Sequence, residues 1–422
     1  METSRYAAES MPSGRDLTAP RSWQNLGMSR AFFPVLVSLS ILRPAAPAFA
    51  QSEPYKVFDT KPVVTQGPYL VATSGTTATI VWLTDAPSHA AVRYAKGTGL
   101  AASALTQVAE PDRHGLVPVG LRHVVVLTGL EPGATYSYQI VSTRVVKLKA
   151  YWPDKGLSAE SDVFHFTTLD PRKPTVAFSF VTDTHEDVNR IRALNNVIDW
   201  KTTEFLVHGG DAFHWLDNED QLFRLWLEPT TAPLGHSTPL LYVRGNHELR
   251  GPFARNLFDY VPTPEGRFYY ARDAGPVHLI LLDTGEDKAD DTNVYAGLNR
   301  TTEYRAAELA WLREHVRTHR RIASAPFRVI AMHQPRWGWL ADGNAAWIAA
   351  ANEARVDLVI AGHMHRFLYE PPNDTHRYHL VVVGQDQVAR VDAWTTELTV
   401  TVESIDGKLV HSMTIPRAGS RR

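Results

Sequence analysis

The chain has 422 residues, of which 44% are hydrophobic and 21% are charged, a balance typical of a soluble globular protein with more than one domain. Its 43 basic and 45 acidic side chains give a formal net charge of −2, so charge gives no reason to expect binding to a nucleic-acid polymer or an anionic membrane. The absence of cysteine excludes disulfides, zinc–thiolate sites, iron–sulfur clusters and a cysteine nucleophile, and leaves 18 histidines, with Asp, Glu, Asn and Tyr, as possible metal ligands.

An apolar stretch at residues 31–42 predicts a secretory leader. The stretch is shorter than the roughly 20 residues that span a bilayer, but it suits the hydrophobic core of a signal peptide, and an Ala-Phe-Ala cleavage pattern follows and ends at Ala50. Prolines within and after the stretch argue against a buried core helix. We therefore expect residues 1–50 to be a leader, with translation starting at Met1 or Met28. The processed protein would have no transmembrane anchor and would be secreted or periplasmic.

Residues 64–169 show the pattern of an antiparallel β-sandwich. Alternating apolar and polar residues form short stretches separated by turn residues, at 79–84, 91–94, 123–127, 136–141 and 163–167. This spacing indicates a sandwich, and Trp82 is expected in its core. The segment 130–136 resembles the corner before a late strand of fibronectin type III modules. Because no catalytic residue types cluster here, we interpret the region as a packing and positioning module.

After a proline-bracketed linker at 170–174, the pattern changes to that of an α/β domain, which we place at residues 174–416. Segments of helical periodicity, such as 303–319 and 344–354, now alternate with apolar runs. The runs lie at 176–181, 205–207, 240–243, 279–282, 329–332 and 358–361. Buried strands that alternate with helices are typical of α/β domains.

Five of these apolar runs are followed at once by residues of the kind that bind metals. These are Asp183 and His185; Asp211; Asn246, His247 and Glu248; His333; and His363 and His365. In α/β sheets the ligand crevice lies at the carboxyl ends of the strands, so neighbouring strands would bring these side chains together. Carboxylate, imidazole and amide ligands suit zinc, manganese or iron.

Each motif alone is a weak signal. A single histidine in an apolar context is usually satisfied in the core or at the surface, Asp183 could cap the helix that follows it, and Asn246 could belong to a plain turn. The complete ordered set, with each motif at the exit of an apolar strand, is not expected by chance.

The set resembles that of the calcineurin-like metallophosphoesterase superfamily over about residues 174–415. Because a sandwich precedes it, the chain resembles the purple acid phosphatases in particular, which place a fibronectin type III-like domain before the catalytic domain. The resemblance implies two mixed sheets flanked by helices, an αββα sandwich, with two metal ions of iron, zinc or manganese. Motif matching implies one ion bound by Asp183, His185, Asp211 and His365, and another bound by Asp211, Asn246, His333 and His363.

Two positions depart from the purple acid phosphatase pattern. That family has Gly two residues after the first Asp and a metal-binding Tyr three residues after the bridging Asp, where this chain has His185 and His214. His185 would replace the missing tyrosine as a ligand, as in the wider superfamily. His214 would then lie beside the ligands or at the substrate rim, and the tyrosinate–iron colour is not expected.

His247 is the expected general acid. It adjoins Asn246, so it can face the same crevice without binding metal, and the resemblance assigns it this role. The expected reaction is attack of a metal-bound hydroxide on phosphorus, followed by protonation of the leaving group, with Glu248 or another carboxylate orienting His247. His214, Arg336 and Trp337 are candidates for substrate binding, although tryptophans here would equally serve in packing.

Together these features predict a secreted or periplasmic, dinuclear metal-dependent hydrolase of small-molecule phosphomonoesters. Phosphodiesters, nucleotides or phospholipid head groups are alternative substrates of the same site. A secreted metal-binding adhesion-type module is the non-enzymatic alternative, but structural metal sites are usually closed and need no residue like His247. The chain has no H-E-x-x-H motif to support an amide-cleaving metallohydrolase, and the sequence predicts no oligomeric state.

Overall fold

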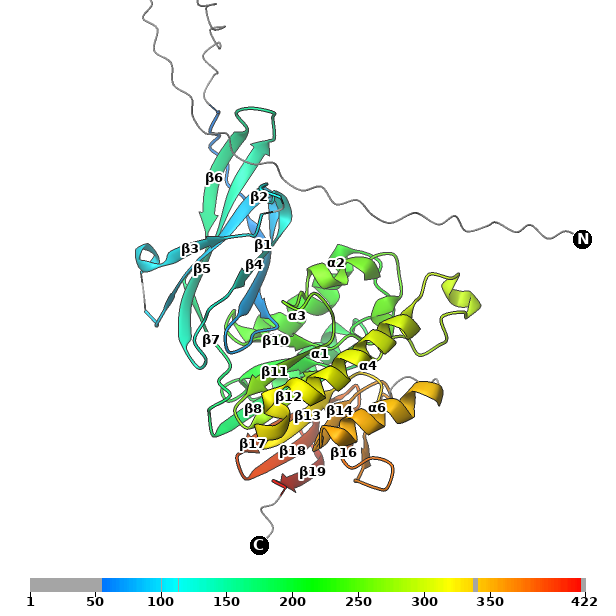
Figure 1. The fold of residues 1–422 in the computed structure, drawn as a ribbon. Helices are drawn as coiled ribbons and strands as arrows, with labels where there is room; N and C mark the ends of the chain where they lie inside the picture. Colours follow the sequence, from blue (N-terminus) through cyan, green and yellow to red (C-terminus); the bar gives the residue numbers. More distant parts are fainter. Residues whose placement is uncertain (1–54, 100, 113, 337–340, 419–422) are drawn as a thin grey trace, which may run out of the picture. The chain divides into compact units, whose positions relative to one another are not determined.

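The structure is a computed structural model that describes residues 55–99, 101–112, 114–336 and 341–418, and Figure 1 follows the chain through its elements. The leader expected at residues 1–50 lies outside the described residues. Within the described residues, no helix combines the length and the apolar character that crossing a membrane requires.

The first part of the described chain is built from strands that pair in antiparallel fashion. They are β1 (Val64–Val71), β2 (Ala78–Lys96), β3 (Thr106–Ala109), β4 (Gly120–Leu127), β5 (Thr135–Lys147), β6 (Asp154–Glu160) and β7 (Phe164–Thr167), with a short 3₁₀ helix at Ala102–Ala104. The first half of β2 pairs with β1 and β4, whereas its second half pairs with β3 and β5. The β-rich region therefore has two sets of strands that share β2.

One long strand replaces the two short strands expected at 79–84 and 91–94. β2 runs through both stretches, and its pairing with β4 shifts register between Leu83 and Ser88. Pro87 lies in this interval, and proline is tolerated at such irregularities because the ladder there needs no N–H donor. The irregularity lets one strand serve both sets instead of ending.

Trp82 lies in the core of this β-rich region, as expected. Its side chain is fully buried, and Nε1 donates a hydrogen bond to Ser142 Oγ at 2.9 Å. Ile80, Tyr138 and Phe166 are buried in the same cluster. The indole thus contributes a large apolar surface while its one polar atom is satisfied.

The remaining strands form the two mixed sheets that carry the predicted site. The first sheet contains β8 (Thr175–Val181), β9 (Phe205–His208), β10 (Leu240–Tyr242), β17 (Gln387–Trp394), β18 (Glu397–Ser404) and β19 (Leu409–Pro416), in the order β19-β18-β17-β8-β9-β10. The second contains β11 (Tyr270–Ala274), β12 (Val277–Leu281), β13 (Phe327–Ala331), β14 (Leu358–Ala361), β15 (Leu368–Glu370) and β16 (His379–Val382), in the order β11-β12-β13-β14-β16-β15. β8, β9 and β10 are parallel, as are β12, β13, β14 and β16.

Helices complete the layers. They are α1 (Val188–Val197), α2 (Glu219–Leu222), a π-helical turn (Phe223–Leu227), α3 (Glu228–Thr231), α4 (Thr301–Thr318), α5 (Arg320–Ser324) and α6 (Ala341–Glu353). Short 3₁₀ helices lie at Ala232–Leu234, His247–Leu249, Ala254–Asp259 and Asn293–Tyr295. α4 and α6 correspond to the helices expected at 303–319 and 344–354, and Figure 1 shows both beside the second sheet.

Successive residues of the central strands pack into different apolar cores, of which there are three in the described part of the two-sheet region. Val207 and Val329 belong to the core between the two sheets, Leu206 packs with α1 on the outer face of the first sheet, and Ile330 packs with α4 and α6 on the outer face of the second. Because side chains alternate across a strand, each sheet covers a core on both of its faces. This arrangement confirms the predicted αββα sandwich.

The β-rich region is continuous with the first sheet. β1 pairs in parallel with β10 through Val71 and Leu240, and the backbone N–H of Ala72 donates to Leu240 O at 3.0 Å. Tyr69 Oη donates to Tyr260 O at 2.8 Å. The described residues accordingly belong to one compact unit.

Candidate metal centre

The predicted ligands follow strands of both sheets and converge at the carboxyl ends of these strands. Asp183, Asp211 and Asn246 follow β8, β9 and β10 of the first sheet, whereas His333 and His363 follow β13 and β14 of the second. β8, β9 and β10 are neighbours in the first sheet, and Figure 1 shows β13 and β14 side by side in the second. Residues that are up to 182 positions apart in sequence, as Asp183 and His365 are, therefore form one site.

Left-handed backbone marks many of these turns. The φ angles of the non-glycine residues Asp183, His185, Asp211, His363 and His365 are 55°, 44°, 51°, 72° and 56°. Such conformations are costly for residues with a Cβ atom and collect at functional sites, where the surrounding structure holds them. Their presence at five predicted ligands indicates that the loops are shaped to aim these side chains.

Glycine allows the loops to approach closely. A Cβ atom on Gly245 would lie 2.2 Å from Asp211 Oδ1, and one on Gly362 would lie 2.1 Å from Thr182 Oγ1. Both contacts are far below van der Waals distance, so a larger residue would push the loops apart. The backbone N–H of His247 instead donates to Asp211 Oδ1 at 3.0 Å, and that of His363 donates to Asp183 Oδ2 at 2.9 Å.

The first predicted ligand group is Asp183, His185, Asp211 and His365, whose ligand atoms all lie within 4.8 Å of one another. His365 Nε2 is 3.3 Å from Asp183 Oδ1, and His185 Nε2 is 3.0 Å from His365 Nε2. Two imidazole nitrogens and two carboxylates therefore face a common point.

The second group contains Asp211, His333 and His363, again within 4.8 Å. His333 Nε2 is 3.0 Å from Asp211 Oδ2, and the Oδ1 atom of Asn246 is 3.1 Å from His363 Nδ1. Asp211 belongs to both groups, so its carboxylate lies where one side chain can serve two neighbouring cations.

Hydrogen bonds orient two of the imidazoles. His185 Nδ1 lies 3.2 Å from Phe213 O, and His333 Nδ1 lies 2.8 Å from Gly209 O. A carbonyl can only accept, so each Nδ1 carries a proton, and each Nε2 points toward the carboxylates. This is the arrangement by which metal-binding histidines are fixed.

The donor set fits metal ions. Asp183 Oδ1 and His333 Nε2 are buried, and their nearest polar neighbours are other predicted ligands, His365 at 3.3 Å and Asp211 at 3.0 Å. Burial lowers the pKa of His185 and of His363 to about 4 in each case, so both are neutral at pH 7, which is the form that binds metal. Oxygen and nitrogen donors without thiolate suit zinc, manganese or iron.

Electrostatics favour positive charge between the two groups. Burial by itself would lower the pKa of His333, but the adjacent Asp211 carboxylate outweighs burial and raises this pKa to about 10. Burial likewise disfavours ionised Asp211, yet His333 holds the pKa of Asp211 well below its usual value. The buried carboxylates thus favour a positive charge, which the His333 imidazolium supplies here and which metal ions would supply in its place when bound.

His247 lies at the edge of this centre. Its Nδ1 atom is 2.7 Å from the backbone carbonyl of His214, and its Nε2 atom is 3.8 Å from Asp211 Oδ2. Arg250 Nη1 lies within 3.1 Å of both ring nitrogens, and Glu286 and Asp287 in turn hold the Arg250 guanidinium. His247 is therefore oriented by a carbonyl and a guanidinium.

Glu248 binds backbone amides instead of orienting the His247 ring. Its buried carboxylate accepts hydrogen bonds from the backbone N–H groups of Asp211, Ala212 and Gly245, at 3.1, 2.6 and 3.0 Å. It therefore ties the turn after β9 to the turn after β10. Glu248 follows His247 in the sequence and was therefore a candidate. Its backbone partners could not be predicted, because every residue type offers a backbone N–H.

The residues considered for substrate binding differ in their surroundings. The exposed His214 ring stacks on His185, with ring centroids 4.5 Å apart, and its nitrogen lies within 4.8 Å of those of His185 and His247. Arg336 is exposed and lies 4.0 Å from Glu370. Trp337 lies outside the described residues. The structure thus places His214 beside the predicted ligands, while the roles of Arg336 and Trp337 stay predictions.

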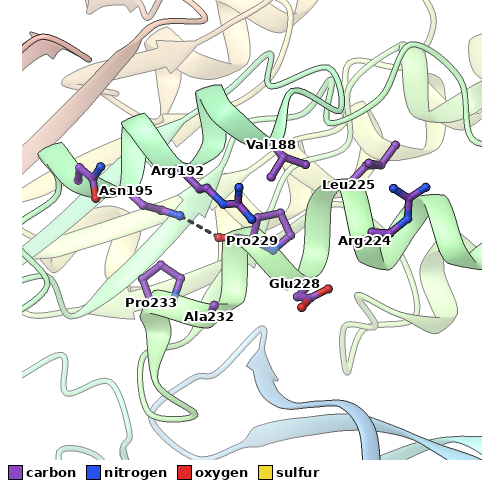
Figure 2. Close-up of a pocket in the computed structure, with 10 residues that line it drawn as sticks. Val188, Arg192, Asn195, Arg224, Leu225, Glu228, Pro229, Ala232 and Pro233 are labelled. Atoms are coloured by element: carbon purple, nitrogen blue, oxygen red, sulfur yellow. Dashed lines mark hydrogen bonds between the residues drawn. The ribbon is translucent and has the colours of Figure 1, made fainter.

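Another cavity lies between α1 and the helical segment around α3, and none of the predicted site residues lines it. Figure 2 shows Val188, Arg192 and Asn195 on one side and Glu228 and Pro229 on the other. Asn195 Nδ2 donates to Pro229 O at 2.9 Å across this space. Its lining has no group of clustered histidines and carboxylates, so we do not place chemistry there.

Comparisons with known proteins agree with this architecture. Residues 177–367 match the family model described as calcineurin-like phosphoesterase, and residues 65–168 match the purple acid phosphatase N-terminal domain. A comparison with curated proteins gave no match.

Among solved structures, one titled "Structure of PhoD" is similar at a TM-score of 0.55 and 11% identity, over 82% of this chain and 92% of that chain. At this identity the likeness shows the fold alone. Vacuolar Protein Sorting 29 from Cryptosporidium parvum covers 58% of this chain and 99% of its own, at 11% identity and a TM-score of 0.31, which is too low to inform the fold.

Proposed function

Since the chain belongs to the calcineurin-like phosphoesterases and carries a purple acid phosphatase N-terminal domain, it is a phosphoesterase, and we propose that it hydrolyses small phosphomonoesters at a two-metal centre. The observation that carries this proposal is the position of Asp211 in both ligand groups. Asp183, His185 and His365 would complete one site with it, and Asn246, His333 and His363 the other. When bound, the two cations would activate water and neutralise the phosphoryl oxygens.

His247 would donate the proton that the leaving group requires. Its Nδ1 atom is engaged by the carbonyl of His214, so Nε2 is the nitrogen from which a proton can reach a substrate over Asp211. The Arg250 guanidinium can only donate and lies 3.0 Å from Nε2, so it would turn away from Nε2 when that nitrogen carries the proton. Positioned general acids of this kind contribute roughly 10²- to 10⁴-fold to turnover.

The proposal is tested on the purified full chain. Metal content should be about two ions per chain, and the protein should release phosphate from an aryl phosphomonoester in a reaction that a chelator abolishes and added metal restores. Faster turnover of a phosphodiester than of the matched monoester would change the proposed substrate class. Absence of hydrolysis of both esters by the metal-loaded protein would overturn the proposal.

We further propose that the protein is exported and cleaved after Ala50. The support is the apolar stretch at 31–42 followed by the Ala-Phe-Ala pattern. The exported chain should begin at Gln51 in N-terminal sequencing. Retention of residues 31–50 on a soluble exported product would contradict the cleavage site.

A further inference from the structure

A cavity of about 600 Å³ begins one side chain away from His247. Arg250, whose guanidinium lies 3.0 Å from His247 Nε2, forms part of its wall. The segment from Lys288 to Asn299, between β12 and α4, forms another part. The volume is in the range of sites that bind small molecules.

Large apolar side chains around this cavity are exposed to solvent. Trp215 is 55% exposed, Val294 is 73% exposed and Leu298 is 69% exposed, and all three line the cavity. Single exposed apolar residues need no explanation, but apolar side chains that gather around one cavity indicate a surface that meets a ligand.

One polar atom in the same wall lacks a partner. Asn299 Nδ2 is buried and makes no hydrogen bond within the described residues, whereas the Tyr295 hydroxyl has the Glu286 carboxylate as its neighbour. Lys288 is paired with Asp287. Arg255, by contrast, is exposed, and the structure shows no ion pair or hydrogen bond for its guanidinium in the described part of the chain. The cavity therefore offers apolar contact, one unsatisfied hydrogen-bonding group and one positive charge without a partner.

We propose that this cavity binds the leaving group of the phosphoester, and that it fits a large apolar leaving group bearing a negatively charged substituent. The inference rests on the proposed function, because His247 as general acid must face the leaving-group oxygen. The leaving group then departs on the side of His247, where the cavity begins. Apolar side chains would contact its body, and Arg255 would pair with the anionic substituent.

The first experiment measures kcat/KM for phenyl phosphate, 2-naphthyl phosphate and a naphthyl phosphate with a distant carboxylate. The leaving groups have similar acidity and differ mainly in apolar size and charge. We expect kcat/KM to rise roughly tenfold from phenyl to naphthyl, the range that added apolar contact in a pocket supplies, and to rise again with the carboxylate. Equal values for the three substrates would overturn the proposal.

Variants test whether the cavity causes the preference for naphthyl over phenyl phosphate. A Val294→Ser/Leu298→Ser double variant should lower the naphthyl-to-phenyl ratio of kcat/KM about tenfold, whereas Leu409→Ser, at a residue of β19 that is 64% exposed, should keep the wild-type ratio. Arg255→Ala should remove the preference for the carboxylate, and Arg313→Ala, at an exposed arginine of α4, should not. Unchanged ratios in the cavity variants would overturn the proposal. Absence of hydrolysis of all three esters by the metal-loaded wild type would instead refute the phosphatase function itself.

Discussion

Two histidine clusters lie at opposite ends of the parallel strands. The predicted metal centre lies at their carboxyl ends, whereas His278, near the start of β12, meets His315 and His319 at the end of α4. In both clusters the ligand atoms lie within 4.8 Å of one another. Proximity of histidines therefore does not separate them.

The backbone conformation and the kinds of ligand atom do separate the two clusters. His278 Nδ1 lies 2.7 Å from Asp273 Oδ1, and His278 Nε2 lies 2.9 Å from His315 Nε2, with ring planes only 12° apart. These two rings face each other as a hydrogen-bonded pair, which satisfies the protein without a metal. At the predicted centre, His185 and His365 form a similar pair at 3.0 Å, but the carboxylates of Asp183 and Asp211 lie among the histidine nitrogens. Left-handed ligand turns and two carboxylates among the ligand atoms, rather than histidine density, thus distinguish the proposed metal site.

The largest expected difference between the two histidine clusters appears when a neighbouring carboxylate is removed. Asp211→Ala should release both ions and reduce hydrolysis to the background of the assay, because only Asp211 belongs to both groups. His185→Ala should mainly weaken one site. Asp273→Ala is the matched control, and it should keep about two ions per chain in elemental analysis. Loss of metal from the Asp273 variant, or retention of both ions by the Asp211 variant, would reverse our assignment of the clusters.

The next largest effect concerns His247. His247→Ala should lower turnover by roughly 10²- to 10⁴-fold while metal content stays near two ions per chain, because the residue is proposed to donate a proton and not to bind metal. The loss should be larger for alkyl phosphates than for nitrophenyl phosphate, since a good leaving group needs less protonation. Steady-state kinetics with both substrates and elemental analysis check this. Equal losses for the two esters would argue against the acid role.

The His278 cluster should respond to pH instead of to metal. Burial, with smaller contributions from His278 and His319, lowers the pKa of His315 to about 3, from an ordinary value near 6.5. The unfolded chain therefore binds a proton at His315 that the folded chain does not, and stability falls as pH drops below 6.5. His315→Asn should reduce the loss of unfolding free energy between pH 7.5 and 5 by about 2 kcal/mol. Denaturant titrations at both pH values measure this, and parallel pH profiles for variant and wild type would contradict it.

The smallest expected signal is a spectroscopic absence. His214 occupies the position of the metal-binding tyrosine in the resembling phosphatases, so the protein should show no strong visible charge-transfer band even when loaded with iron. An absorption spectrum of the iron-loaded protein decides this. A strong band would mean that a tyrosine elsewhere binds the metal and that the ligand list is incomplete.

Much of the site could be predicted because each ligand motif directly follows its strand in the sequence. The apolar run of each strand and the ligand motif after it lie within about ten residues, and parallel pairing then brings the exits together. The same reasoning predicted the αββα layers. The role of Glu248 could not be predicted in this way, because it depends on the backbone N–H groups of Asp211 and Ala212, which every residue type would offer equally.

Other features depend on contacts between distant segments. His278 and His315 are 37 residues apart and belong to no motif, so nothing in the sequence pointed to their pairing. The two strands expected at 79–84 and 91–94 form the single strand β2, whose pairing with β4 shifts register between them. The alternation of apolar and polar residues does not predict this shift. The pairing of Val71 with Leu240 joins two regions whose patterns differ.

That pairing has a consequence for any attempt to dissect the molecule. Because β1 pairs with β10 at Leu240, the first sheet continues into the β-rich region on this side. A shortened protein beginning at the linker near residue 174 would free the Leu240 carbonyl, which now accepts from the backbone N–H of Ala72, while the N–H and C=O groups of Tyr242 would keep their hydrogen bonds to the Tyr270 hydroxyl. Uncovered edges recruit strands from other molecules, so such a fragment should self-associate. The β-rich region therefore protects this edge of the first sheet from pairing with other molecules.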